Sequence, residues 1–194
     1  MLHMVYGGSA SGKSSYAESI AMSLQGDGRL LYIATMYPYK WGKAELDPET
    51  MQRIERHRAM RADKGFDTVE CYRHVEHIVA KRQDVLLLEC MSNLLANEMY
   101  LEPDANARSG MSKTMSPVSK KIVQALVALS ARVQDVVIVT NDVFSDGGSL
   151  TYDESTREYV KNLAEINCAL AREAATVTEV VCGIPVKIKG DKQP

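Results

Sequence analysis

Near its N-terminus the chain carries the stretch Gly7-Gly8-Ser9-Ala10-Ser11-Gly12-Lys13-Ser14, directly after an apolar run from Leu2 to Tyr6. Four residues separate Gly7 from Gly12, and Lys and Ser follow, which is the P-loop pattern. That pattern requires a strand before it and a helix after it, and the flanking residues indicate both. The stretch therefore predicts a phosphate-binding loop within an α/β domain.

Each part of this loop has a role in binding phosphate. Glycines let successive backbone N–H groups converge on phosphate oxygens, and the positive end of the following helix adds to the attraction. Lys13 reaches the outer phosphates, and the hydroxyl of Ser14 can ligate Mg²⁺. A chance glycine-rich turn is the alternative, but it is rare once the strand and the helix are required. We therefore predict a site for a nucleoside triphosphate, ATP or GTP.

Short apolar runs alternate with segments of helical patterning along the chain. The predicted strands are Leu2 to Tyr6, Leu30 to Ala34, Val85 to Leu88, Val136 to Thr140 and Val177 to Val181, with an edge strand at Val186 to Lys189. The predicted helices are Gly12 to Leu24, Pro48 to Arg61 with Asp47 as its cap, Val75 to Lys81, Ser116 to Ser130 and Glu154 to Ala174. This alternation indicates parallel strands with crossover helices. The predicted fold class is α/β, a P-loop NTPase-like sandwich with a mostly parallel central sheet flanked by helices.

Length and composition fit one domain over residues 1–194. The formal net charge is -2, which argues against a broadly basic protein that binds nucleic acid or a membrane surface. The four cysteines are widely spaced, and no apolar run approaches the length of a membrane span. We therefore expect a cytoplasmic protein with free thiols and no membrane span.

The second predicted helix carries a histidine among arginines. Arg53, His57 and Arg61 stand four residues apart, and Arg56 and Arg58 flank the histidine. Side chains at this spacing share one helix face, so the imidazole lies among guanidinium groups that attract phosphate. A neutral imidazole nitrogen can attack phosphorus. Taken alone, a solvated basic face with an incidental histidine is the simpler interpretation.

Polar residues follow two other predicted strands. Glu89 follows the run Val85 to Leu88, where P-loop proteins usually place an acidic residue that organises magnesium. A solvated acid at a strand end is the alternative. Asn141 and Asp142 end another strand, and ligands of open α/β sheets bind beyond such ends. Asp142 suits a turn equally well.

Two further features have less specific interpretations. Cys71, His74 and His77 are spaced as on one helix face, without an apparent fourth ligand for zinc. The polar stretches Pro103 to Pro117 and Phe144 to Asp153 are predicted to be surface loops, and a substrate lid is the alternative.

Taken in order, several blocks resemble the bifunctional adenosylcobinamide kinase / adenosylcobinamide-phosphate guanylyltransferase family of cobalamin biosynthesis. The blocks are Gly7 to Ser14, Tyr32 to Thr35, Arg53 to Arg58, Asp67 to Glu70 and Leu88 to Cys90. The likeness continues through Val139 to Val143, Arg157, Tyr159, Asn167 and Val181 to Pro185. It covers most of the chain apart from the middle loop.

The resemblance implies two reactions on a corrinoid substrate. The first is phosphorylation of the aminopropanol hydroxyl of adenosylcobinamide. The second is transfer of GMP from GTP to that phosphate through a guanylylated histidine, and His57 matches the nucleophile position. The family also implies a homotrimer with nucleotide sites near the subunit contacts.

The resemblance also implies roles for individual residues. Lys13 and His57 would be catalytic, and Gly7 to Ser14 would hold phosphates. The other positions near the nucleotide would be Ala34, Thr35, Met36, Arg58, Arg61, Glu70 and Glu89. Ser14 and Glu89 are the predicted ligands of Mg²⁺.

The sequence departs from the family after Asn141-Asp142-Val143. The family usually has a short glycine-rich segment ending in Pro there, whereas residues 144–152 are longer and lack the Pro. Two alternative functions therefore stay open, a single-activity P-loop small-molecule kinase and a non-catalytic nucleotide-binding module.

Overall fold

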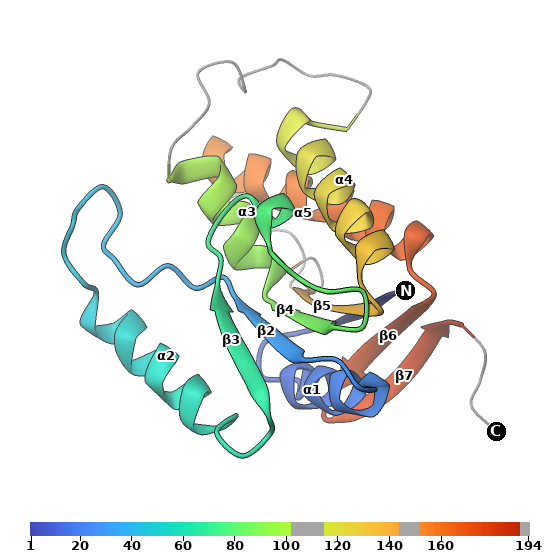
Figure 1. Cartoon of the computed structure of the whole chain (residues 1–194). Helices are drawn as coiled ribbons and strands as arrows, with labels where there is room; N and C mark the ends of the chain where they lie inside the picture. Colours follow the sequence, from blue (N-terminus) through green and yellow to red (C-terminus); the bar gives the residue numbers. More distant parts are fainter. Residues whose placement is uncertain (102–114, 144–151, 191–194) are drawn as a thin grey trace.

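The computed structural model (Figure 1) describes residues 1–101, 115–143 and 152–190, which contain one seven-stranded sheet. Its strands are β1 (Leu2–Gly7), β2 (Leu30–Ala34), β3 (Phe66–Glu70), β4 (Val85–Glu89), β5 (Asp135–Asn141), β6 (Thr176–Val181) and β7 (Ile184–Lys189). The helices are α1 (Lys13–Leu24), α2 (Pro48–Ala59), α3 (Met91–Tyr100), α4 (Pro117–Arg132) and α5 (Glu154–Glu173).

The strands lie in the order β3-β2-β4-β5-β1-β6-β7. Each neighbouring pair from β3 to β6 is parallel, and β7 pairs antiparallel with β6. Parallel strands end at the same edge of a sheet, so the segments that follow β1, β2, β4 and β5 meet there. The predicted fold class is confirmed.

Helices cover both faces of this sheet (Figure 1). On one face, Ala17 and Ala21 of α1 share a core cluster with Leu87 of β4. On the other face, α3, α4 and α5 pack over a larger core, which includes Leu86 and Leu126. Because successive strand residues point to opposite faces and both faces are covered, the central strands are continuous apolar runs.

The structure contains every strand that the sequence predicts, and it adds β3 and α3. β3 is an edge strand whose Asp67, Thr68 and Glu70 are exposed, so it lacks the apolar run that marks the central strands. Only one residue, Cys90, separates the end of β4 from the start of α3. In the sequence its apolar residues follow those of β4 almost without a break, so no separate helix is apparent.

The predicted helix from Val75 to Lys81 is wrong. Only a 3-10 turn forms at Val75–His77, and His74 before it has a left-handed backbone with φ 56°. Beyond the turn, the Lys81 N–H donates to the Asp84 carboxylate at 2.8 Å, and this local bond replaces a helical one. Cys71, His74 and His77 therefore do not share a helix face.

Most of the two predicted surface loops, 103–117 and 144–153, lies outside the described residues. Within the described part of the chain, no helix has the length and apolar character to cross a membrane.

The helix α2 stands apart from the packed helices. Asp47 caps it by accepting a hydrogen bond from the Thr50 N–H at 3.1 Å, and Pro48 occupies the first turn. None of its residues is buried, and Figure 1 shows it beside β3 at the edge of the sheet. It ends at Ala59, before the predicted Arg61. Its position therefore depends on a few contacts at the site.

The turn before β2 allows a test of the packing. A Cβ on Gly28 would lie 1.8 Å from the carbonyl oxygen of Gln83, so Gly28→Ala must push two backbone segments apart. We expect it to lower the free energy of unfolding by about 1–3 kcal/mol, measured by urea denaturation. Gly26→Ala is the control, because its Cβ would lie 3.6 Å from Gln134. Equal losses in both variants would contradict this account.

Candidate active site

The predicted phosphate-binding loop joins β1 to α1 at the carboxyl edge of the sheet. Residues 8–10 at its tip are exposed. Gly12 has a left-handed φ of 91°, and a Cβ there would lie 3.2 Å from the Cα of Gly183 in the β6–β7 turn. The Gly183 N–H also donates to the Ser11 carbonyl at 2.8 Å. The β6–β7 hairpin therefore supports the loop from behind and leaves its tip open to phosphate.

Lys13, Ser14 and Glu89 lie around this loop. Lys13 Nζ donates to the Gly8 carbonyl at 3.0 Å, and Ser14 Oγ donates to Glu89 Oε1 at 2.6 Å. The second carboxylate oxygen, Glu89 Oε2, is buried and has no hydrogen-bond partner among the described residues. Magnesium prefers oxygen ligands. The unpartnered oxygen beside a serine hydroxyl therefore fits a magnesium ion.

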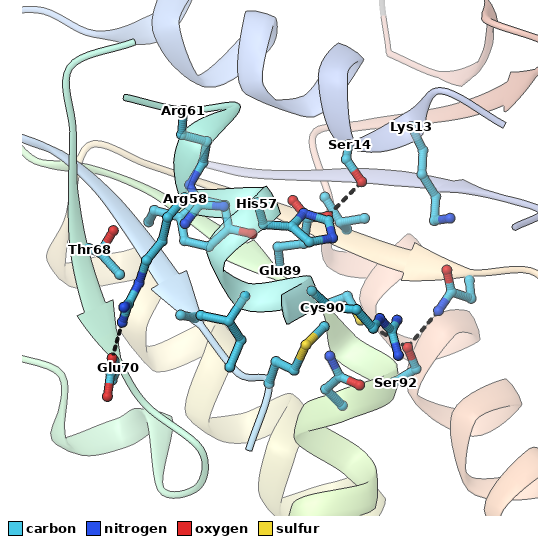
Figure 2. A pocket seen from close by; sticks show the side chains of 18 of the residues that line it. Lys13, Ser14, His57, Arg58, Arg61, Thr68, Glu70, Glu89, Cys90 and Ser92 are labelled. Atoms are coloured by element: carbon cyan, nitrogen blue, oxygen red, sulfur yellow. Dashed lines mark hydrogen bonds and ion pairs between the residues drawn. The ribbon is translucent and has the colours of Figure 1, made fainter. Parts of the chain in front are cut away.

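A cavity of about 360 Å³ opens between this loop and α2, and we call it the central cavity. Its lining includes Lys13 and Ser14 from α1, His57 from α2 and Glu89 from β4. Figure 2 shows the side chains of His57, Ser14 and Glu89 gathered together, with Lys13 beyond Ser14. Elements far apart in the sequence thus bring the P-loop and the histidine into one space.

Arg61 lies just beyond α2 and is only 6% exposed. Its guanidinium carbon is 3.4 Å from the centroid of the Tyr32 ring, a cation–π contact. Among the described residues, its buried Nε and Nη1 atoms have no hydrogen-bond partner. Burial and the nearby Glu89 carboxylate raise the pKa of Tyr32, so that ring stays neutral. Buried donors without partners are costly, and an anionic ligand would satisfy them.

Glu70 is engaged by two neighbours. Arg58 Nη2 donates to one of its oxygens at 2.5 Å, and the Tyr72 hydroxyl donates to the other at 2.7 Å. Burial, followed by the bond to Glu70, raises the pKa of Tyr72. Glu70 therefore connects α2 to the end of β3. Because Arg58 and Glu70 are half exposed, their ion pair adds little stability.

Most of the predicted site residues meet at the central cavity. Those that line it are Ser9, Ala10, Lys13, Ser14, Ala34, Met36, His57, Arg58, Arg61, Glu70 and Glu89. Gly7, Gly8, Ser11 and Gly12 belong to the loop without lining the cavity. Thr35 is buried behind it, where its Oγ1 accepts from the Cys90 N–H at 2.8 Å. Asn141 lines the cavity and Asp142 does not.

The structure also adds lining residues to which the sequence analysis gave no role. They are Tyr32, Ile54, Tyr72, Ser92 and Asn93, among others. Tyr32 had a detectable signal, because it is two residues from Ala34 on a predicted strand and so shares its face. Ser92 and Asn93 lie on the helix α3, which the sequence did not reveal. Asn141 Nδ2 donates to the Ser92 hydroxyl at 2.5 Å, which joins two walls of the cavity.

Comparison with known proteins gives a match over nearly the whole chain. The family described as "Cobinamide kinase / cobinamide phosphate guanyltransferase" matches residues 3–188. The chain belongs to this family. It is 30% identical over 198 residues to the "Bifunctional adenosylcobalamin biosynthesis protein CobU" of Escherichia coli (strain K12), covering 97% of this chain and 100% of the relative. The protein of the same description from Salmonella typhimurium (strain LT2) is 30% identical over 199 residues, with the same coverage.

A solved structure is similar in fold. The flagellar accessory protein FlaH from Methanocaldococcus jannaschii gives a TM-score of 0.51 at 12% identity, and the match covers 99% of this chain and 81% of that chain. Likeness at this identity concerns the fold alone. The family match confirms the predicted enzyme class, a cobinamide kinase / cobinamide phosphate guanylyltransferase.

The unpartnered guanidinium of Arg61 leads to a testable expectation. Arg61→Met should weaken GTP binding about tenfold or more, measured by calorimetry, because charge-assisted hydrogen bonds to phosphate are lost. The melting temperature without nucleotide should not fall, because Met still packs on Tyr32 while an unpaired buried charge is removed. Arg56→Met is the control, since Arg56 is exposed outside the cavity. Lower stability with unchanged GTP affinity would make Arg61 purely structural.

Proposed function

We propose that this member of the family catalyses two successive reactions on adenosylcobinamide. In the first, ATP or GTP phosphorylates the aminopropanol hydroxyl. The hydroxyl oxygen bonds to the γ-phosphorus, the bond from that phosphorus to the β–γ bridging oxygen breaks, and the nucleoside diphosphate and a proton leave. In the second, GMP passes from GTP to the new phosphate, which gives adenosylcobinamide-GDP. Family membership supports both activities.

One observation carries the proposed histidine route. His57 lines the same cavity as Ser9, Lys13 and Ser14 of the P-loop. A triphosphate held by the loop therefore lies within the space that the imidazole faces. Arg58 and Arg61 line that space too, which places positive charge around the reacting phosphates. This arrangement is the one that a covalent guanylyl-histidine requires.

The second reaction then proceeds in two displacements at the α-phosphorus of GTP. The unprotonated ring nitrogen of His57 bonds to this phosphorus, the bond to the α–β bridging oxygen breaks, and pyrophosphate leaves. A phosphate oxygen of the acceptor next bonds to the same phosphorus, the nitrogen–phosphorus bond breaks, and His57 is regenerated. Lys13 and the arginines stabilise the negative charge on the phosphate oxygens.

Ser14 and Glu89 are the residues that would hold Mg²⁺ here. Bound there, the ion would supply Lewis-acid stabilisation of the phosphate oxygens. The pairing of Ser14 with one oxygen of Glu89, and the unpartnered second oxygen, support this assignment.

The two alternative functions explain less of the cavity. A single-activity kinase needs the P-loop, but it gives no role to the histidine and arginines that α2 directs into the same space. A non-catalytic module gives no role to either group, and the family match disfavours it.

We also propose a cytoplasmic homotrimer. The resemblance to the family is one support for this assembly. The exposed strand β7 is another, because Ile184, Val186 and Ile188 leave an apolar surface of the kind that subunit contacts bury. Neither nucleic acid nor a membrane is a proposed partner.

The histidine route predicts a covalent label. Wild-type protein incubated with GTP labelled at the α-phosphate should retain an acid-labile label after denaturation, and GTP labelled at the γ-phosphate should leave none. His57→Ala should abolish the label while Arg56→Met keeps it, because Arg56 lies outside the cavity. The label is read on a denaturing gel. Wild-type protein without any label would overturn the covalent route.

The proposed metal ligands predict a shift in magnesium dependence. Glu89→Gln should raise the Mg²⁺ concentration for half-maximal labelling about tenfold, because a neutral amide is a weaker ligand than a carboxylate. Glu55→Gln, an exposed change on α2 outside the cavity, should leave it unchanged. A titration of Mg²⁺ at saturating GTP measures both. An identical midpoint in Glu89→Gln would remove Glu89 from the metal site.

A further inference from the structure

Five aromatic side chains form a connected series beside the central cavity. We call them the aromatic shelf, and they are Tyr37, Tyr39, Trp41, Tyr72 and Tyr100. Ring centroids are 5.4 Å apart for Tyr37 and Tyr39, 5.4 Å for Tyr37 and Tyr72, 6.3 Å for Tyr37 and Trp41, and 6.1 Å for Trp41 and Tyr100. Three of these rings lie in the β2–α2 connection, Tyr72 lies just after β3, and Tyr100 ends α3, so the rings join three segments of the chain.

The shelf is open to solvent. Tyr39, Trp41 and Tyr100 are 38%, 51% and 42% exposed. Figure 1 shows the β2–α2 connection extending outward past the end of β2 before it returns to α2. A contiguous patch of exposed aromatic rings on a soluble enzyme usually marks a binding surface, because apolar area gains free energy when it leaves water.

The shelf continues into the central cavity through shared residues. Tyr72 and Glu70 line the central cavity and also a second, wider hollow of about 770 Å³. Tyr37 lines that hollow, along with the apolar side chains of Val69 and Ile78. A ligand lying on the shelf therefore has one end beside Tyr72, at the wall that the two spaces share.

Most side chains that line this hollow are apolar or aromatic, and its two charged residues, Glu70 and Arg73, are each in an ion pair. Burial, with the Glu76 carboxylate adding to it, raises the pKa of Cys71 to about 11, so its thiol is neutral. The rings of His74 and His77 stack at 5.7 Å with an interplanar angle of 19°, which adds a flat surface. This hollow therefore suits a flat, mostly apolar body better than a polyanion.

We infer that the aromatic shelf binds the corrin macrocycle of the acceptor and lets its phosphorylated side chain enter the central cavity at His57. This inference rests on the proposed function. The acceptor is the only reactant with a large macrocycle, whose edge carries methyl groups and neutral amide side chains, and such a ring packs on aromatic faces. GTP and His57 already share a cavity of about 360 Å³, so the macrocycle must lie outside it. The shelf is the apolar surface that adjoins this cavity.

The first test uses wild-type protein. Trp41 is the only tryptophan in the chain, so hydroxyl-radical oxidation followed by peptide mass spectrometry measures its exposure directly. Saturating adenosylcobinamide should slow the oxidation of Trp41 and Tyr39 about threefold or more, while GTP alone should not. Met22 on α1 is 43% exposed and serves as the reference position. Equal oxidation of Trp41 with and without the corrinoid would overturn the inference.

The second test uses variants of the shelf. In the double variant Tyr39→Ala/Trp41→Ala, the KM for adenosylcobinamide phosphate should rise about tenfold, while kcat and guanylylation of His57 stay within about twofold. Of two single variants, Trp41→Ala should also weaken binding of adenosylcobinamide phosphate, and Trp41→Phe should keep most of the wild-type affinity. Met22→Ala on α1 is the control, because it removes a similarly exposed apolar side chain that lines neither the central cavity nor the second hollow. Melting temperatures establish that each variant is folded.

The outcomes separate the inference from the proposed function. If the double variant is folded and its KM for the corrinoid is unchanged, the inference that the shelf binds the corrin is wrong. A raised KM for GTP alone assigns the rings to the guanine base, which also overturns it. If the double variant does not fold, the oxidation of Trp41 in wild-type protein decides. Failure of wild-type protein to label His57 defeats the covalent route, whereas protection of Trp41 by the corrinoid would still support the shelf.

Discussion

The contact between Arg61 and the ring of Tyr32 holds α2, the helix that carries His57, against the sheet. α2 itself has no buried residue, so no apolar core anchors it. Arg61 is a buried group just beyond its end, Arg58 of α2 pairs with Glu70, and Lys64 after the helix pairs with Glu18 of α1. Polar contacts at a solvent-exposed edge open at low cost compared with core contacts. The histidine therefore stands on an element that can adjust to a ligand without disturbing the core.

The same region contains polar groups whose bonding is incomplete. Ser11 Oγ, Glu89 Oε2 and two nitrogens of Arg61 are buried without a partner among the described residues. Each of these groups lies at the P-loop, at the end of β4 or next to α2, whereas the central strands have their polar groups paired in the sheet. Such groups destabilise the free protein, and the nucleoside triphosphate and Mg²⁺ of the proposed function would satisfy them. The folded chain thus gains stability when it binds the ligand that the site is shaped for.

The sequence predicted the elements that have a local apolar pattern of their own, including the edge strand β7, and it missed β3 and α3, which lack one. The P-loop, its flanking elements and the cap at Asp47 are set by short-range chemistry, so their positions were readable. β3 exposes Asp67, Thr68 and Glu70, so it lacks the apolar run of a central strand. The chain leaves the 3-10 turn at Ile78, and Asp84 then binds the Lys81 N–H, a contact that no periodicity encodes. The stacking of Arg61 on Tyr32 joins residues from different elements. A single sequence offers no signal for such a pairing, although both residues lay within predicted elements.

The two proposed reactions use one cavity beside one phosphate loop, so they must take place there one after the other. P-loops hold the β- and γ-phosphates, so in the proposed function the α-phosphorus of the triphosphate is the one left for His57, which lines the same cavity. The two proposed reactions use different phosphorus atoms, because the hydroxyl bonds to the γ-phosphorus and the acceptor phosphate bonds to the α-phosphorus. Phosphorylation lengthens the acceptor side chain. With the corrin on the proposed shelf, the added phosphate would extend the side chain toward His57, so one seating of the acceptor would serve the second reaction after the first.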